Sequence, residues 1–215
     1  MYIPHPSFQL NEIFSKKPYQ GVAPDQAAFL FIGLDANYQE QIATEPIFSK
    51  ILEYHSDGVA FWQNNGVHHP FLLTGYKGAG KRYHRTFANI GFRPQHADLV
   101  SFVELLHIPT VGRNKLDVTD LELSHLKMLN SAILDGQAKY IFISDNVHRL
   151  ILASGAFPWI AKQPKESDGP LGILFHRNDK TVFKHLHFSN YGIFAQRMTE
   201  EATFIGNLLP WQTAF

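Results

Sequence analysis

Four short apolar segments alternate with amphipathic helical patterns along the chain, and this alternation most limits the folds open to it. The apolar segments are rich in β-branched and aromatic residues and end at turn residues, which is typical of buried strands. They cover residues 28–33, 98–103, 139–144 and 181–187, and the helical patterns cover residues 45–54, 81–91, 119–134 and 193–209. This alternation predicts the α/β class, as a three-layer αβα fold with a central, mostly parallel four-stranded sheet.

The helical pattern at 119–134 has the clearest predicted beginning. Leu121, Leu126 and Leu129 recur along one side of it, as expected for a helix that packs on a sheet. Thr119 is followed three residues later by Glu122, which is the spacing of a capping box. We therefore expect this helix to begin at Thr119.

The length and composition of the chain favour one folding unit. With 215 residues, 45% of them hydrophobic, the chain can bury a large core, and residues 1–215 are predicted to form a single domain. Residues 1–25 and 155–170 are rich in proline and glycine, and we expect them to be irregular. A monomer is the expected oligomeric state.

The absence of cysteine bears on the compartment. Neither a disulfide framework nor a thiolate metal site can form without it, and a cytoplasmic location is expected. The N-terminal residues lack the basic and apolar regions of a signal peptide, and the sequence has no apolar stretch of the length that spans a bilayer. Membrane association is therefore not expected.

Polar residues follow each predicted strand. In parallel sheets, ligands bind outside the carboxyl ends of the strands, so these turns are expected to meet at one rim. They contain Gly33, Asp35, Asn37 and Tyr38 after the first strand, Glu104 after the second, Ser144 and Asn146 after the third, and His187, Ser189 and Asn190 after the fourth. Any one of these residues alone is more often a loop or cap residue than a catalyst. Their joint placement is the stronger indication of a site.

A basic segment lies between Asp57 and Asp98, where the chain has no acidic residue. Five Lys or Arg residues fall there, although Lys plus Arg equals Asp plus Glu, at 19 each, over the whole chain. They are Lys77, Lys81, Arg82, Arg85 and Arg93, and the first four are predicted to contact DNA phosphates. The alternative, a basic helix balanced by acidic neighbours in the fold, stays open.

Four segments, in order, carry a resemblance to a known family. GLDAN at 33–37 is similar to the first motif of the uracil-DNA glycosylase superfamily, and HFSNYG at 187–192 lies where that superfamily has His-Pro-Ser or Asn-Pro-Ser. KRYHRTFANIGF at 81–92 and the segment 102–126 resemble the mismatch-specific uracil/thymine glycosylase branch. The chain resembles a diverged member of this superfamily, over about residues 28–209.

The resemblance implies a DNA glycosylase that hydrolyses the N-glycosidic bond of a deaminated or mismatched base. Asp35 would orient the attacking water and offset the charge of an oxocarbenium-like sugar, with Asn37 as the next candidate. His187 would donate a hydrogen bond to the departing base. Phe71 would stack on that base once it is flipped from DNA. The implied substrate-binding residues are Gly33, Tyr38, Phe71, Glu104, Ser189 and Asn190.

Three positions depart from the family pattern. Phe188 replaces a proline, Asn190 replaces a glycine, and Glu104 stands where many relatives carry an asparagine that reads the base. These departures keep a second function class open, in which the same fold serves as a non-catalytic module that binds nucleic acid or a protein.

Two further interpretations have weaker support in the sequence. GYKGAGK at 75–81 has the glycine and lysine spacing of a phosphate-binding loop, but Arg82 stands in place of the Ser or Thr that holds magnesium. The chain has twelve histidines, including the pairs His68 with His69 and His185 with His187, and histidine is a common metal ligand, so a metal site is a second interpretation. With no HExxH motif or carboxylate cluster, neither a metal nor another cofactor is expected.

Overall fold

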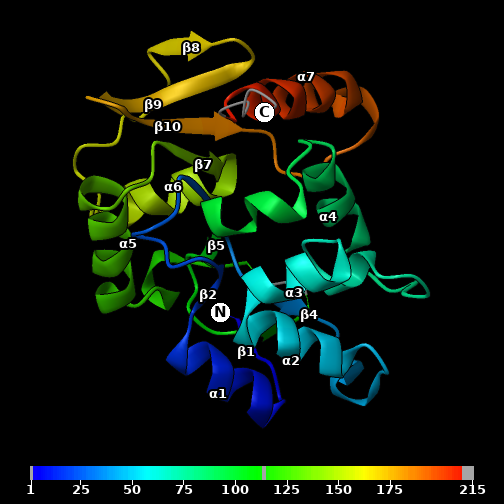
Figure 1. The fold of residues 1–215 in the computed structure, drawn as a ribbon. Helices are drawn as coiled ribbons and strands as arrows, with labels where there is room; N and C mark the ends of the chain where they lie inside the picture. The colour runs from blue at the N-terminus through cyan, green and yellow to red at the C-terminus, as the bar shows by residue number, and fades with distance from the viewer. Residues whose placement is uncertain (1, 113–114, 210–215) are drawn as a thin grey trace.

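The computed structural model describes residues 2–112 and 115–209. Within these residues, seven strands form the main sheet, in the order β2–β5–β3–β7–β10–β9–β8. The strands are β2 (Tyr19–Gly21), β3 (Phe29–Gly33), β5 (Val100–Glu104), β7 (Tyr140–Ser144), β8 (Glu166–Asp168), β9 (Leu171–Arg177) and β10 (Lys180–His185). The fold is α/β, as the alternation of apolar segments predicted (Figure 1).

The prediction of a four-stranded, mostly parallel sheet was wrong in strand number and direction. The four predicted strands do form the parallel centre, β5–β3–β7–β10. However, β2 joins one edge antiparallel to β5, and β9 and β8 extend the other edge antiparallel to β10. Two of the added strands are weak sequence signals, because β2 is three residues long and β8 is exposed throughout. The third, β9, was missed although it is seven residues long with Leu171 and Leu174 buried. The sheet is therefore mixed.

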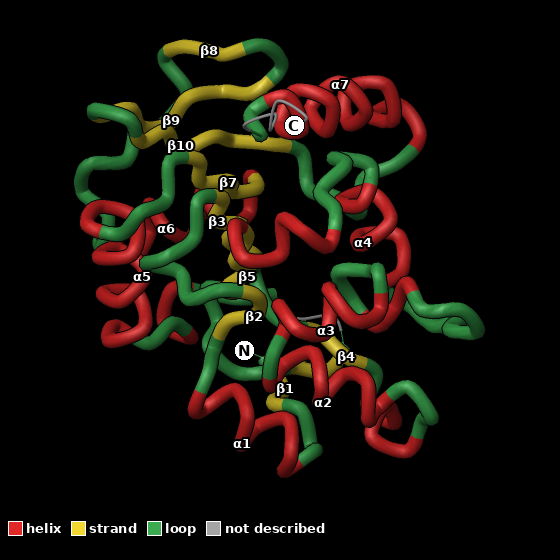
Figure 2. Tube along the Cα trace, viewed as in Figure 1, coloured by secondary structure: helices red, strands yellow, loops and turns green. Residues whose placement is uncertain are grey.

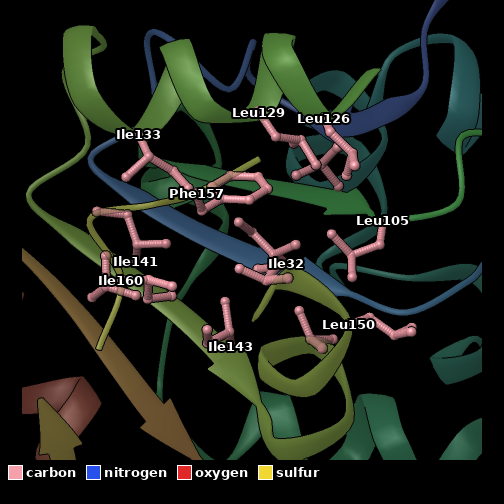
Figure 3. Close-up of a cluster of buried hydrophobic side chains, with 14 of the residues drawn as sticks. Ile32, Leu105, Leu126, Leu129, Ile133, Ile141, Ile143, Leu150, Phe157 and Ile160 are labelled. Atoms are coloured by element: carbon pink, nitrogen blue, oxygen red, sulfur yellow. The ribbon is translucent and has the colours of Figure 1, made fainter. Parts of the chain in front are cut away.

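Side chains of the central strands alternate between two apolar layers. Leu30 and Ile32 point to one face, while Phe29 and Phe31, one residue out of phase, point to the other. The first face packs on α5 and α6, and Figure 3 shows Leu126 of α5 above Ile32. The second face packs on α3, α4 and α7. These helices are α3 (Gly58–Asn65), α4 (Lys81–Ala88), α5 (Leu123–Asp135), α6 (Asp145–Ser154) and α7 (Ala195–Asn207).

A third apolar cluster lies beside the β2 edge of the sheet. It joins α1 (Phe8–Lys16) and α2 (Phe48–Ser56) to a small second sheet. That sheet consists of β1 (Ile3–Pro4), β6 (Thr110–Val111) and β4 (Asn37–Tyr38), in this order, and lies near α1 and α2 in Figure 2. It fixes the turn after β3, because Asn37 pairs with Thr110.

The N-terminal segment is more regular than predicted. Residues 1–25 were expected to be irregular, but α1 forms there, and the Ser7 side chain caps it by accepting the backbone N–H of Leu10. Residues 155–170 are irregular as far as β8, which begins at Glu166. Short 3-10 helices complete the fold: η1 (Glu40–Thr44), η2 (Pro70–Leu72), η3 (Pro94–Leu99), η4 (Val118–Asp120) and η5 (Gly192–Phe194).

The predicted capping box at Thr119 was wrong. Asp117 and Asp120 form a capping box around η4, and α5 begins only at Leu123. Glu122 is the N-cap residue of α5 but makes no side-chain cap hydrogen bond; its carboxylate accepts from the Ser124 hydroxyl and lies 3.0 Å from Nε2 of His107. Aspartate accepts backbone N–H groups readily at a helix start. Asp117 therefore caps η4, which begins before the predicted helix start.

No helix among the described residues has an apolar stretch long enough to cross a membrane.

Candidate functional site

A cavity of about 370 Å³ opens at the carboxyl ends of the four parallel strands. Residues at or just after the end of each strand line it: Gly33 from β3, Glu104 from β5, Ser144 from β7 and His187 after β10. Predicted site residues in its lining are Gly33, Asp35, Asn37, Tyr38, Phe71, Glu104, His187 and Ser189. The strand ends therefore meet as the parallel pairing predicts.

Asn190 is the one predicted substrate-binding residue that lies outside this cavity. It lines a neighbouring cavity of about 460 Å³, which shares Ser144, Asn146 and His187 with the first. The backbone N–H of Asn190 donates to the carbonyl of His187, at 2.9 Å, and closes the turn after β10. Asn190 therefore shapes the turn that holds His187.

Asp35 is held by the small second sheet. The Thr110 hydroxyl donates to Oδ2 of Asp35 at 2.6 Å, and the amide of Asn37 lies 3.5 Å from the same oxygen. That amide also donates to the carbonyl of Gly112, at 2.6 Å. Asn37 is thus occupied in fixing the loop, while Asp35 lies at the cavity wall. This geometry makes Asp35 the better candidate to orient water, with Asn37 as a positioning residue.

Glu104 lies against the glycine of the turn after β3. A Cβ atom at Gly33 would stand 2.6 Å from Cδ of Glu104, so a side chain there would displace the carboxyl group. Burial, together with the nearby charge of Asp35, raises the pKa of Glu104 to about 8. Glu104 is consequently protonated at neutral pH, and its carboxyl group carries an O–H donor beside a carbonyl acceptor.

His187 presents one nitrogen as a donor. Its Nδ1 accepts the backbone N–H of Ser189 at 3.2 Å, so the neutral ring carries its proton on Nε2. Burial lowers its pKa, and the charge of Asp35 opposes this shift more weakly. Phe188, the residue after His187, is 2% exposed and packs against Tyr83, at 5.3 Å between ring centroids. The core thereby anchors the turn that carries His187.

Aromatic residues form one wall of the cavity. Phe71 stacks on Tyr76, with ring centroids 4.3 Å apart and planes 9° apart, and it is 5% exposed. The Tyr38 hydroxyl lies 2.6 Å from Nε2 of His55, and burial raises the pKa of Tyr38. Phe71 is thus both a cavity residue and part of the third apolar cluster.

Three histidines pack together beside this wall, and two of them, His69 and His84, line the cavity. The rings of His69 and His84 stack 3.4 Å apart, and Nε2 of His68 lies 3.3 Å from Nδ1 of His84. Burial lowers the pKa of all three, so they are uncharged at neutral pH. Within the described ranges, no three His, Asp or Glu residues are grouped to hold a metal ion.

The cavity includes residues that sequence reasoning missed. Gln20 lies on the short edge strand β2, Tyr54 on α2, and Tyr83 and His84 on α4. A signal for Tyr83 exists in the sequence, because it lies four residues before the buried Phe87 on the same helix face. Gln20 falls in the segment predicted to be irregular, so no comparable signal marks it.

The basic segment leads into the cavity mouth. Lys77, Arg82 and Arg85 are exposed, whereas Nζ of Lys81 donates to the carbonyl of Tyr76 at 2.8 Å. Lys81 therefore helps to hold the turn ahead of α4, and Arg82 and Arg85 are the better candidates for phosphate contact. The structure gives the phosphate-loop interpretation no further support, because 75–81 follows η2 and has no strand directly before it within the described residues.

Exposed apolar side chains follow the His187 turn. Tyr191 is 71% exposed and Ile193 is 92% exposed. The guanidinium of Arg82 lies 4.5 Å from the centroid of the Tyr191 ring, which brings the loop beside α4. An apolar, basic surface thus borders the cavity.

Comparisons with models of known families, with curated proteins and with solved structures found no match to this chain.

Proposed function

We propose that this chain is a DNA N-glycosylase of the uracil-DNA glycosylase type, which hydrolyses the bond between deoxyribose and a deaminated or mismatched base. One observation carries the proposal: Asp35, Glu104 and His187, from three different strand ends, line a single cavity. Its volume of about 370 Å³ falls in the range of small-ligand sites. The cavity thus joins a carboxylate, a neutral acid and a histidine donor around one ligand.

Each polar group has a role in the reaction. Water attacks C1′ of the sugar, the C1′–N bond breaks, and its electron pair leaves with the base. Asp35 orients the water and offsets the positive charge on the sugar. Nε2–H of His187 donates to a carbonyl oxygen of the base as negative charge develops there. The proton lost by water ends on the base, so the products are the free base and a sugar hydroxyl.

The surface around the cavity suits DNA. An enzyme of this kind must take the base out of the stack before it reaches C1′. The exposed side chains of Tyr191 and Ile193 would fill the space that the base leaves, and Arg82 and Arg85 would contact phosphates. These features favour DNA as the partner.

The test is direct. Oligonucleotides that contain uracil, hypoxanthine or a G·T mismatch, single-stranded and duplex, are incubated with excess protein and then treated with alkali, which cleaves abasic sites. The proposal expects strand cleavage at the modified position with the wild-type chain, and loss of it in Asp35→Asn. The absence of release from every substrate would overturn the catalytic proposal.

The alternative is a non-catalytic module that binds nucleic acid or a protein on the same fold. Glu104 favours it, because an acid stands where the glycosylases that the chain resembles have an asparagine. In this case the same oligonucleotides are bound without base release, and Asp35→Asn leaves their affinity unchanged.

A further inference from the structure

Gln20 is a buried polar residue at the cavity with an unmet hydrogen bond. It lines the cavity and is 4% exposed, and its Nε2 has no hydrogen-bond partner within the part of the chain that the structure describes. Buried amide groups are normally paired, because water cannot compensate for the lost bond. An acceptor on a ligand would supply the missing partner.

The strand register brings Gln20 close to Glu104. Gln20 pairs with Phe102 across the antiparallel ladder of β2 and β5, so their side chains share a face. Glu104 lies two residues beyond Phe102 on β5 and therefore points to the same side. All three residues line the cavity. The amide and the carboxyl group are thus diagonal neighbours on one wall.

The two groups offer a defined hydrogen-bonding pattern. The protonated carboxyl group of Glu104 presents an O–H donor next to a carbonyl acceptor, and Gln20 adds an N–H donor that has no partner in the described chain. A ring N–H beside a carbonyl, which is a lactam edge, can give its N–H to Glu104 and take donors from Glu104 and Gln20. If the base carried an amino group in place of the carbonyl, that amino group would be a donor facing the N–H donor of Gln20, and no hydrogen bond would form between them.

We infer that Gln20 and Glu104 bind the edge of the base, and that Gln20 selects bases with a lactam edge over bases with an amino group. Uracil and hypoxanthine have this edge, whereas cytosine and adenine carry the amino group instead. Deamination converts the second kind of base into the first. The inference rests on the proposed function, and it adds to that function a specificity-determining residue, Gln20.

Binding of free bases tests the inference without catalysis. Wild-type protein is titrated with uracil, cytosine, hypoxanthine and adenine, and the chemical shifts of its amide groups are followed by NMR. We expect uracil and hypoxanthine to bind at least about tenfold more tightly than their amino counterparts. Equal affinity for uracil and cytosine would overturn the inference.

Two variants assign the preference to the residues. Gln20→Met keeps the length of the side chain but removes the donor, and it should weaken uracil binding about tenfold while leaving cytosine binding unchanged. Gln63→Met, at an exposed position of α3, is the matched control and should behave as wild type. Glu104→Leu, with its fold checked by circular dichroism, should weaken the binding of uracil and cytosine alike, because a neutral carboxyl group can pair with either edge. A preference for uracil that persists in Gln20→Met would contradict the inference.

The outcomes separate this inference from the proposed function. If free uracil is preferred over cytosine but no oligonucleotide loses a base, the glycosylase proposal fails and base reading by Gln20 stands. If uracil is released from DNA but Gln20→Met releases it at the wild-type rate and binds free uracil as tightly, the inference fails and the glycosylase stands.

Discussion

The carboxyl group of Glu104 lies directly against the Cα atom of Gly33, its partner in the parallel pairing of β3 and β5. A Cβ atom at Gly33 would come within 2.6 Å of Cδ of Glu104. The glycine that opens the GLDAN turn therefore leaves the space that the Glu104 carboxyl group occupies, and any side chain there would displace this group. The backbone conformation at Gly33 imposes no such demand, because its φ is outside the positive region.

Gly33→Ala should displace Glu104 and impair the site. The added methyl group forces the carboxyl group from its place, and a shift of about 1 Å at a reacting site commonly costs on the order of 100-fold in rate. We expect a comparable loss of base release, and a loss of stability of about 1 to 3 kcal/mol from overpacking. Urea unfolding and single-turnover assays measure both.

A double-mutant cycle controls for a general defect. If the clash with Glu104 is the cause, adding Glu104→Ala to Gly33→Ala should restore part of the lost stability. Strictly additive losses would show that Gly33→Ala acts elsewhere.

Glu104→Gln should stabilise the protein at neutral and alkaline pH. In the unfolded chain Glu104 ionises near its ordinary pKa, whereas burial raises its pKa to about 8 in the fold. The folded state therefore holds an extra proton between about pH 4.5 and pH 8, and the free energy of unfolding falls as the pH rises through this window. Glutamine keeps a donor and an acceptor but does not ionise.

The gain from Glu104→Gln should be small at pH 5 and should reach on the order of 2 kcal/mol at pH 8. Urea unfolding at several pH values measures it. The groups that face Glu104 are Asp35, Tyr38, Tyr54 and Tyr83. Asp35→Asn is the control. Removing the nearby charge should lower the pKa of Glu104, so the fall in unfolding free energy should end at a lower pH but should still occur. If Glu104→Gln stabilised the protein equally at every pH, the raised pKa of Glu104 would not be the cause of the stabilisation.

The sequence predicted the centre of the fold better than its edges. β3, β5 and β7 are continuous apolar runs because both of their faces are covered, and such runs are unambiguous. β2 and β8 lie at the sheet edges, where three residues and exposed polar side chains leave no periodic pattern. Their pairing depends on contacts distant in sequence, which local reasoning does not contain.

The same division holds for the site. Asp35, Glu104 and His187 could be predicted because they follow strands that run parallel, and parallel strand ends meet. Gln20 could not, because it reaches the cavity from the antiparallel edge strand β2. The stacked rings of His69 and His84 likewise join η2 to α4 through tertiary packing alone.

Arg82→Glu should weaken binding to DNA. Arg82 is exposed beside the cavity mouth, and a lost phosphate contact reduces the slope of log affinity against log salt by about 0.9. We expect affinity for a 20-mer duplex to fall several-fold at low salt, as measured by fluorescence anisotropy. Lys127→Glu, exposed on α5 across the sheet, is the control of equal charge change. Equal effects of the two variants would indicate that only net charge matters.

His187→Ala and Phe71→Leu should have separable defects. Removing the His187 donor should slow base release in single-turnover assays while DNA binding persists. Phe71→Leu keeps an apolar side chain in the third cluster but removes the stacking surface, which is worth about 1 to 3 kcal/mol per base. It should chiefly weaken affinity for free uracil. Slower release with unchanged uracil affinity in Phe71→Leu would place Phe71 in the core alone.

Asp35→Asn provides the sharpest test of the proposed chemistry. Removing one preorganised electrostatic group commonly costs about 3 kcal/mol, so single-turnover base release should fall by on the order of 100-fold or more. Affinity for substrate DNA should survive, because the change leaves the size of the side chain unaltered. Thr110→Val removes the 2.6 Å hydrogen bond that holds Asp35 and should give a smaller loss of release with the same affinity. Release at the wild-type rate in Asp35→Asn would mean that another group holds the water, and Asn37→Ala, which also removes an amide donor from that loop, would then be the variant to lose it.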